Sequence, residues 1–254
     1  MTALSARKAR LFPKTIYAMN EISTVWFDLD DTIWDFRRNS RISQRILYDR
    51  FSIGRFCESP EKWIETYERY NTALWNRYNV GEISRQTLMV HRFVLPLTEL
   101  GMSEKEIMES HSAMSDFYLD ILSRQTSLVP GAREAVEAAG NAGYKVGILS
   151  NGFREVQYKK LSSGGMDGMF DVIVLSDEIE VNKPDIRIFR YAEEKAGIKS
   201  GESLMIGDNP STDIAGAVNA GWSAVFFNRD GEGKAALPEG VTEITDLREC
   251  RNLF

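Results

Sequence analysis

The sequence contains few cysteines and histidines, the residues that form disulfide bonds in secreted domains and bind transition metals. Only two cysteines and two histidines occur among 254 residues. Cys57 and Cys250 are far apart and match no metal-binding or redox spacing, so the sequence predicts two reduced thiols and no disulfide framework. His91 and His111 have no acidic or cysteine pattern around them, which favours ordinary surface or core histidines over metal ligands.

Long hydrophobic runs are missing as well. No window approaches 18 uninterrupted apolar residues, and the N-terminus lacks the apolar segment of a secretory signal. Residues 1–20 are basic, as in a transit peptide or a nucleic-acid-binding arm, but this segment is short and the chain carries a formal charge of −6. We therefore expect residues 1–20 to form a disordered leader, and a start at Met19 would lose nothing that the fold needs. The sequence further predicts a soluble cytoplasmic protein with no nucleic-acid or membrane partner.

The remaining sequence has an ordinary globular composition, with 43% apolar and 27% charged residues, and is long enough to bury a core. Short apolar runs alternate with amphipathic helical stretches, which predicts βαβ units and a parallel sheet. The predicted strands are residues 24–27, 144–149, 172–175, 204–207 and 224–227. The intervening helices are expected to begin near Arg133, Arg154, Asp185 and Ser211, with Gly143, Gly197 and Gly221 as stops.

Residues 36–126 interrupt this alternation with continuous helical periodicity. The spacing of positions 63, 67, 70, 74 and 78, four of them aromatic, places them on one helix face, for which a core-facing stripe is the usual meaning. The sequence therefore predicts an α/β fold with a Rossmann-like parallel-sheet core, residues 21–35 and 127–254, and an inserted all-helical domain, residues 36–126.

Polar residues collect where the predicted strands end. They are Asp28, Ser150 and Asn151, Asp177, Asp208 and Asn209, and Asn228. In open parallel sheets, ligands bind outside the carboxyl ends of the strands. Three acids, Asp28, Asp30 and Asp31, lie at the first of these strand ends. This arrangement is unfavourable for stability, because like charges at such short distances raise one another's pKa and oppose folding. An isolated motif of this kind commonly makes only a turn, but five such strand ends indicate a functional site.

Four segments carry a family resemblance. "DLDDT" (28–32), "SNG" (150–152), Lys183 followed by Pro184, and "GDNPSTD" (207–213) resemble, in this order, the four motifs of the haloacid dehalogenase superfamily. The helical insert resembles the cap domain of the subfamily that carries its lid after the first motif. The resemblance implies a Rossmann-like core and a Mg²⁺-dependent phosphatase that acts on a small phosphorylated metabolite through an aspartyl-phosphate.

The resemblance also implies roles for individual residues. Asp28 would be the nucleophile, and Asp30 would protonate the leaving alcohol and then activate water. Ser150, Asn151, Gly152, Lys183 and Thr32 would bind the phosphoryl group, although Thr32 alone could be a turn or cap residue. Asp28, Asp208 and the backbone carbonyl of Asp30 would ligate Mg²⁺, with Asp213 orienting a metal-bound water.

Elementary chemistry supports a cation independently of the resemblance. A phosphate monoester is a dianion, which carboxylates alone would repel. Asp28, Asp30 and Asp208 at one site therefore make sense with a hard cation, and oxygen ligands suit Mg²⁺.

The sequence is compatible with several alternative functions. By the resemblance, Asp30 argues against dehalogenation, because carbon–halogen cleavage needs no proton on the leaving group. A sugar phosphomutase or a sugar phosphatase would use the same residues, and a scaffold that lost the chemistry would not need them. "SNGF" and residues 170–189 look closest to the branch of pyrimidine 5′-nucleotidases.

The insert offers two features that suit a nucleotide. Residues 36–56 hold six arginines against a single acid, and the aromatic residues between 63 and 78 could stack on a base. Arg37, Arg41 and Arg45, however, follow the i, i+4 spacing of one helix stripe, which is equally typical of a solvated face.

Overall fold

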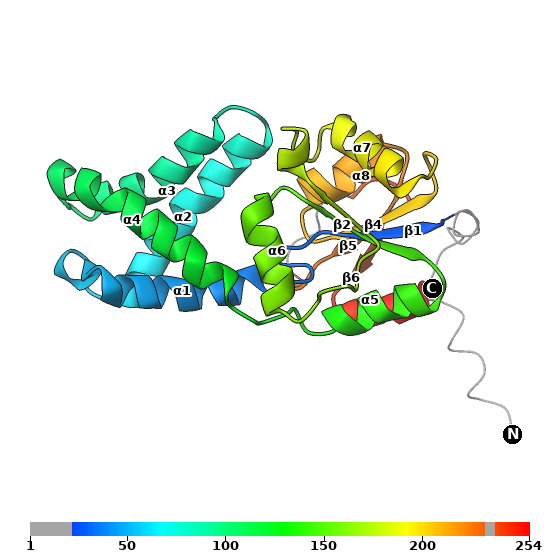
Figure 1. Ribbon diagram of the computed structural model, residues 1–254, viewed down its shortest axis with the longest axis horizontal. Coiled ribbons are helices and arrows are strands. Elements are labelled where there is room, and N and C mark those ends of the chain that lie inside the picture. The colour runs from blue at the N-terminus through cyan, green and yellow to red at the C-terminus, as the bar shows by residue number, and fades with distance from the viewer. Residues whose placement is uncertain (1–21, 232–236) are drawn as a thin grey trace, which may run out of the picture.

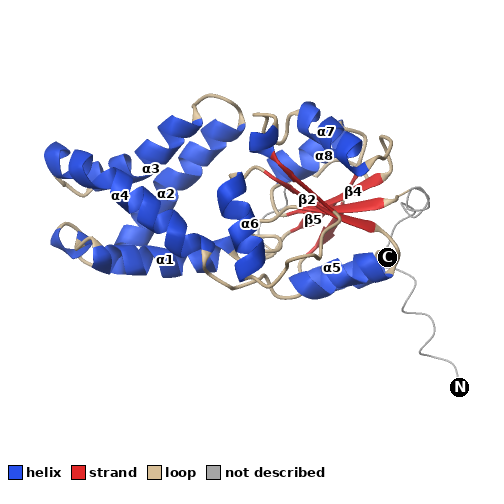
Figure 2. Ribbon diagram, in the orientation of Figure 1, coloured by secondary structure: helices blue, strands red, loops and turns tan. Residues whose placement is uncertain are grey.

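The computed structural model describes residues 22–231 and 237–254. The leader predicted at residues 1–20, with the possible start at Met19, lies outside the described residues. Six parallel strands form one sheet in the order β3-β2-β1-β4-β5-β6. The strands of this sheet are red in Figure 2. Their bounds are β1 Thr24–Phe27, β2 Lys145–Ser150, β3 Val172–Leu175, β4 Ser203–Gly207, β5 Ser223–Phe227 and β6 Thr242–Ile244.

The predicted fold class is confirmed, and five strands lie within one residue of the predicted bounds. Strand β6 was missed. Its three residues, Thr242–Ile244, bury only Ile244 and so lack the continuous apolar run that marked the others.

Strand β1 lies at the centre of the sheet and sends side chains to both faces. All four of its residues are buried. Val25 and Phe27 pack in the core cluster on the α5 side, and Trp26 packs in the cluster under α7 and α8. Figure 1 shows α5 (Ala132–Asn141) on one side of the sheet and α7 (Ile186–Ala196) with α8 (Ala215–Asn219) on the other. Helices on both faces explain why the strands read as unbroken apolar runs.

The helix starts agree with the prediction to within one residue, with one change of type. The helix expected near Ser211 begins as a π-helical turn, Pro210–Ile214, which leads into α8. Asn209 caps this turn, because its Oδ1 accepts hydrogen bonds from the backbone N–H groups of Ser211 (2.9 Å) and Thr212 (3.1 Å). The three predicted stop glycines all have left-handed φ values, of 67° to 92°.

Four helices lie together beside the carboxyl edge of the sheet (Figure 1). They are α1 Phe36–Arg50, α2 Pro60–Asn79, α3 Arg85–Glu99 and α4 Glu104–Ser123. Ser59, Ser84 and Ser103 cap the last three, each accepting a backbone N–H three residues on. The helical prediction for this region agrees with the structure, while the domain boundaries at 36 and 126 stay a prediction.

The aromatic stripe of α2 is mainly core, as its spacing predicts. Tyr67 is buried among the rings of Trp63, Phe93 and Tyr118, at centroid distances of 5.9, 5.3 and 5.5 Å. Tyr70 is only half-buried. The stripe therefore fixes the packing of the four helices and offers little of its surface to a ligand.

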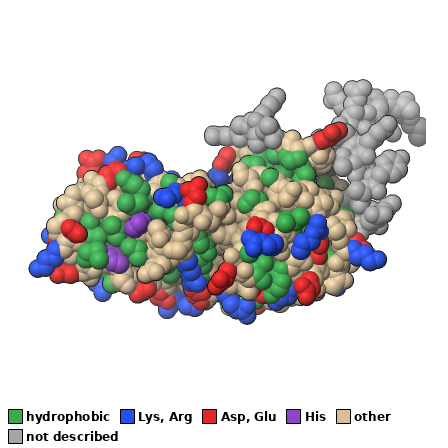
Figure 3. All heavy atoms as spheres, turned by 90° about the horizontal axis from the view of Figure 1, so that it is seen from above, with side chains coloured by type: hydrophobic (Ala, Val, Ile, Leu, Met, Phe, Trp, Pro, Cys, Tyr) green, Lys and Arg blue, Asp and Glu red, His purple; other side chains and the backbone are tan. Residues whose placement is uncertain are grey.

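The two cysteines and the two histidines differ in their burial. Cys57 and Cys250 are buried free thiols. His91 is exposed and His111 half-buried, in line with the purple patches on the helical part in Figure 3. Within residues 22–231 and 237–254, every helix is too short or too polar to span a bilayer.

Candidate active site

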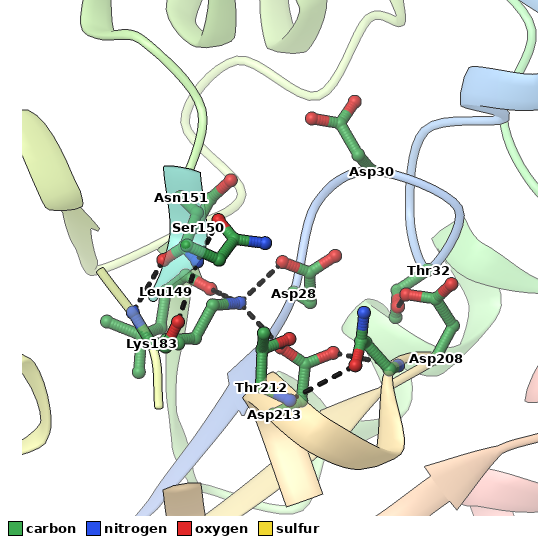
Figure 4. Close-up of polar contacts among 12 residues, drawn as sticks. Asp28, Asp30, Thr32, Leu149, Ser150, Asn151, Lys183, Asp208, Thr212 and Asp213 are labelled. Carbon is green, nitrogen blue, oxygen red and sulfur yellow. Dashed lines mark hydrogen bonds and ion pairs between the residues drawn. The ribbon is translucent and has the colours of Figure 1, made fainter. Parts of the chain in front are cut away.

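Three adjacent strands of the sheet deliver the predicted residues to one edge. Asp28 follows β1 directly, Ser150 ends its neighbour β2, and Asp208 follows β4 on the other side. Because the strands are parallel, their carboxyl ends meet at this edge, and the side chains converge there (Figure 4).

Lys183 is at the centre of the polar contacts. Its ammonium group lies 2.6 Å from Asp28 Oδ1 and 2.8 Å from Asp213 Oδ1, and it also donates to the carbonyl oxygen of Leu149 at 2.6 Å. The side chain is buried. Burial disfavours its charge, but Asp213 and Asp28 outweigh that penalty and raise the pKa of Lys183. The lysine is therefore a fixed cation beside two carboxylates.

Asn151 holds Lys183 in place. Its Oδ1 accepts the backbone N–H of Lys183 at 2.8 Å, and its Nδ2 donates to the Lys183 carbonyl oxygen at 3.0 Å and to Asn79 Oδ1 at 3.0 Å. The side chain of Asn151, predicted to bind phosphate, is thus committed to the backbone of Lys183 and to helix α2.

Three carboxylates form a cluster that could hold a metal ion. Asp28, Asp208 and Asp213 each offer an oxygen atom, and these atoms lie within 4.8 Å of one another. Burial is the main cause that raises the pKa of Asp28 to about 7 against the opposing effect of Lys183, and the pKa of Asp208 is raised by burial and by the charges of Asp28 and Asp213. Because Lys183 supplies one positive charge for three acids, this oxygen donor set fits a hard divalent cation.

Glycine allows Asp213 to lie in the cluster. A Cβ atom added to Gly207 at the end of β4 would overlap the carboxyl group of Asp213. Thr32 is fully buried, and its hydroxyl donates to Asp208 Oδ1 at 3.4 Å. Thr32 does not line the cavity of the site, so the structure places it against a carboxylate and not against the space for a phosphate.

The side chain of Asp30 points away from Asp28 (Figure 4). Its Oδ1 lies 2.7 Å from Lys160 Nζ, and its Oδ2 accepts a hydrogen bond from Gln157 Nε2 at 2.9 Å. Gln157 Nε2 also donates to Ser150 Oγ at 2.7 Å. The amide group of Gln157 therefore links Ser150, at the end of β2, to Asp30.

Sequence reasoning missed Gln157 and Lys160. Both are buried on helix α6 (Arg154–Ser163), and Lys160 Nζ also lies 4.8 Å from the ring centroid of Trp34. A usable signal existed, because the two polar residues are spaced i, i+3 on a helix that starts directly after "SNG". Gly152 has a related purpose, since a Cβ atom there would overlap the amide of Gln157.

A cavity of about 280 Å³ joins this edge of the sheet to the helices α2, α3 and α4. On the sheet side it is lined by the predicted residues Asp28, Asp30, Ser150, Asn151, Gly152, Lys183, Asp208 and Asp213. On the helical side it is lined by Asn71, Thr72, Trp75, Asn76, Asn79, Arg92, Leu119 and Leu122. The cavity thus has an acidic, lysine-containing end and an end formed by helices.

The arginine stripe of α1 lies outside the cavity. Arg37 pairs with Asp230, Arg41 with Glu68 at 2.7 Å, and Arg45 with Glu61. On the face that Figure 3 shows, basic and acidic side chains are mixed as well. The solvated-face interpretation of this stripe is therefore the one that agrees with the structure.

Comparisons with known proteins agree with the fold and the site. Residues 22–221 match the family described as haloacid dehalogenase-like hydrolase. The chain is 30% identical to the pyrimidine 5′-nucleotidase YjjG of Escherichia coli over 91% of its length and 96% of the relative's. It is 27% identical to a glyceraldehyde 3-phosphate phosphatase of Methanothermobacter thermautotrophicus, over 92% of this chain and all of that protein.

A solved structure gives the same picture. The magnesium-bound crystal structure of YfnB from Bacillus subtilis matches with a TM-score of 0.81 and 26% identity, over 91% of this chain and 98% of that one. The resemblance seen in the four motifs is thereby confirmed. The chain belongs to the haloacid dehalogenase-like hydrolases.

Proposed function

We propose that this hydrolase is a Mg²⁺-dependent phosphomonoesterase whose substrates are nucleoside 5′-monophosphates, with pyrimidine nucleotides preferred. The observation that carries the reaction class is the contact of 2.6 Å between Asp28 and Lys183, beside Asp208 and at one end of the cavity. This end combines a carboxylate nucleophile with a fixed cation and further acidic ligands, which is what phosphoryl transfer needs. The two free thiols fit the cytosol, which we propose as its location.

Two carboxyl groups share the work of the reaction. An oxygen atom of Asp28 attacks phosphorus, the bond to the leaving oxygen breaks, and Asp30 gives that oxygen a proton. Asp30 then takes a proton from water as the water oxygen attacks the aspartyl-phosphate, and the bond from Asp28 to phosphorus breaks. Both groups return to their starting protonation states, and inorganic phosphate is released.

Other residues balance the charge of the phosphoryl group. Lys183 stabilises its oxygens and the ionised form of Asp28, and the Ser150 hydroxyl with the backbone N–H groups after it donates hydrogen bonds. Asp28, Asp208 and the Asp30 carbonyl would hold Mg²⁺, with Asp213 close by. Bound there, the ion would offset the negative charge of the cluster and of the phosphoryl oxygens.

The nucleotide part of the proposal rests on the helical end of the cavity and on relatives such as YjjG. Trp75 and Phe153 both line the cavity, with ring centroids 5.5 Å apart. Trp75 is half-buried, and the flat face of its ring suits a base, while Asn71 and Asn76 add amide groups to the lining of the same cavity. Asp30, two residues after the nucleophile, serves an oxygen leaving group and has no use in dehalogenation.

A panel of phosphate esters tests the proposal. We expect kcat/KM for UMP and dTMP to exceed the values for AMP, glucose 6-phosphate and glyceraldehyde 3-phosphate, with phosphate release lost in EDTA and restored by Mg²⁺. A hexose or triose phosphate that outperforms every nucleotide tenfold would overturn the substrate assignment. Conversion of glucose 1-phosphate into glucose 6-phosphate, without phosphate release, would point to a mutase.

Lys160→Met should lower kcat on alkyl phosphates by roughly 10²-fold, because Asp30 loses the cation that holds its carboxyl group. p-Nitrophenyl phosphate, which has a good leaving group, should lose much less. The neighbouring Lys159 is exposed, so Lys159→Met is the matched control. Equal losses on both kinds of ester would argue that Lys160 does not act through Asp30.

A further inference from the structure

Arg92 of helix α3 is a buried cation. It is 3% exposed, and no carboxylate of the described part of the chain forms an ion pair with it. Surface arginines nearby behave differently, for instance Arg69, which pairs with Glu99 at 2.6 Å. A buried charge is costly unless it is paired, so an unpaired one calls for a functional explanation.

Aromatic groups hold the guanidinium group of Arg92 without neutralising it. Its Nε donates to Tyr67 Oη at 3.0 Å, and Nη1 has only a weak contact of 3.7 Å with the sulfur of Met89. The carbon of the guanidinium lies 4.7 Å from the ring centroid of Tyr118 and 5.5 Å from that of Phe93. Cation–π contacts stabilise the charge of the guanidinium group, but they accept no hydrogen bond from its remaining N–H groups.

These N–H groups belong to a residue that lines the cavity. Asn71 lines it too, and its Oδ1 is 3.4 Å from Tyr67 Oη, which already accepts from Arg92 and so can donate its own hydrogen there. Asn79 Oδ1 accepts from Asn151 in the same way. The side-chain oxygens of both amides are engaged, so Arg92, Asn71 and Asn79 present hydrogen-bond donors, and a ligand group that meets them must supply acceptors.

We infer that Arg92, with Asn71, binds a carbonyl oxygen of the base and thereby selects nucleotides whose base carries one. This inference rests on the proposed nucleotidase function. Uracil, thymine and cytosine all have a carbonyl oxygen, whereas adenine has none and turns an amino donor outward. A donor facing Arg92 leaves both groups unpaired, so a site of this kind rejects adenine more strongly than shape alone would. The aromatic ring of Trp75, which lines the same cavity and is half-buried, suits a flat ligand better than a small carboxylate.

Arg92→Met and Arg92→Lys test the inference through kcat/KM for UMP, AMP, phosphoserine and p-nitrophenyl phosphate, with Mg²⁺ present. In Arg92→Met, UMP should lose roughly 10²-fold, and the ratio of UMP to AMP should fall towards one. The loss on p-nitrophenyl phosphate, whose leaving group carries no carbonyl, should be at least tenfold smaller. Arg92→Lys keeps the charge without the planar fork and should fall between the two. Arg69→Met, an exposed arginine away from the cavity, is the control.

Thermal unfolding separates this role from a structural one. Methionine replaces an unpaired buried charge, so the melting temperature of Arg92→Met should equal or exceed that of the wild type. If this variant does not fold, Asn71→Ala should show the same change of the UMP-to-AMP ratio on a smaller scale.

Three results would overturn the inference. A wild-type protein that hydrolyses UMP, with an unchanged UMP-to-AMP ratio in both Arg92 variants and Asn71→Ala, removes Arg92 but keeps the nucleotidase. A larger loss on phosphoserine than on UMP identifies a carboxylate subsite. A wild-type protein without activity on any nucleotide contradicts the proposed function itself.

Discussion

Asp28→Asn is expected to reduce turnover of every phosphate ester by at least about 10⁴-fold, because an amide cannot form the acyl phosphate. The fold should survive. Burial is the main reason why the pKa of Asp28 is raised to about 7, so a neutral side chain suits this position, and Lys183 retains Asp213 at 2.8 Å. Phosphate release, circular dichroism and the melting temperature check both parts of this expectation.

The neighbouring Asp31 supplies the control for Asp28. It belongs to the same crowded group, and burial raises its pKa to about 6, but its carboxyl group accepts the backbone N–H of Arg37 at 2.9 Å. Its φ of 63° suits asparagine, so Asp31→Asn should fold and lose less than tenfold in activity. Intact-mass analysis of acid-quenched samples should show a phosphoryl adduct in the wild type and in Asp31→Asn only. Near wild-type activity in a folded Asp28→Asn protein would remove Asp28 as nucleophile.

The sheet and the acidic end of the site were predictable because they depend on local sequence. A strand that is buried on both faces has a continuous apolar sequence, and the residue at its end must lie at the carboxyl edge of the sheet. These two rules place Asp28, Ser150 and Asp208 at one edge without any knowledge of the loops. Strand β6 could not be predicted from its own composition, because its pairing is determined by the neighbouring strand β5.

The helical end of the cavity could not be predicted in this way. Arginines at 37, 41 and 45 and at 92 look alike in sequence, and only the packing of α2, α3 and α4 decides that Arg92 is buried beside the cavity while the others pair with surface acids. Periodicity gives the inward face of a helix but not what that face meets. For the same reason the sequence alone does not identify Lys160, since its partner Asp30 lies 130 residues away.

The two acids that follow β4 should respond in opposite directions to the loss of their charge. Asp208 has a raised pKa, caused by burial and then by Asp28 and Asp213. A carboxyl group of this kind stabilises the fold below its unfolded pKa of about 4, and that stability is lost as the pH rises through the folded value. In metal-free buffer at pH 8, Asp208→Asn should therefore raise the melting temperature, and the gain should shrink as the pH falls towards 4.

Asp213→Asn should lower the melting temperature under the same conditions. Asp213 is buried, and its Oδ1 lies 2.8 Å from Lys183, so the substitution removes one of the two acids that balance a buried cation. The opposite signs of the two changes in melting temperature distinguish Asp208, whose charge is not balanced in the metal-free protein, from Asp213, whose charge is balanced by Lys183.

Magnesium should complete the contrast between the two acids. Mg²⁺ raises the melting temperature of any protein whose folded state binds it, by mass action. This shift should be large in the wild type at pH 8 and nearly absent in Asp208→Asn, whose activity should fall at least roughly 10²-fold even at high Mg²⁺. Asp213→Asn should keep part of the Mg²⁺ shift, because Asp28 and Asp208 remain. Differential scanning calorimetry with EDTA or Mg²⁺ measures both quantities. Equal Mg²⁺ shifts in the two variants would contradict the assignment of Asp208 as the more direct ligand, because the loss of a direct ligand should weaken Mg²⁺ binding more than the loss of a carboxylate that is engaged with Lys183.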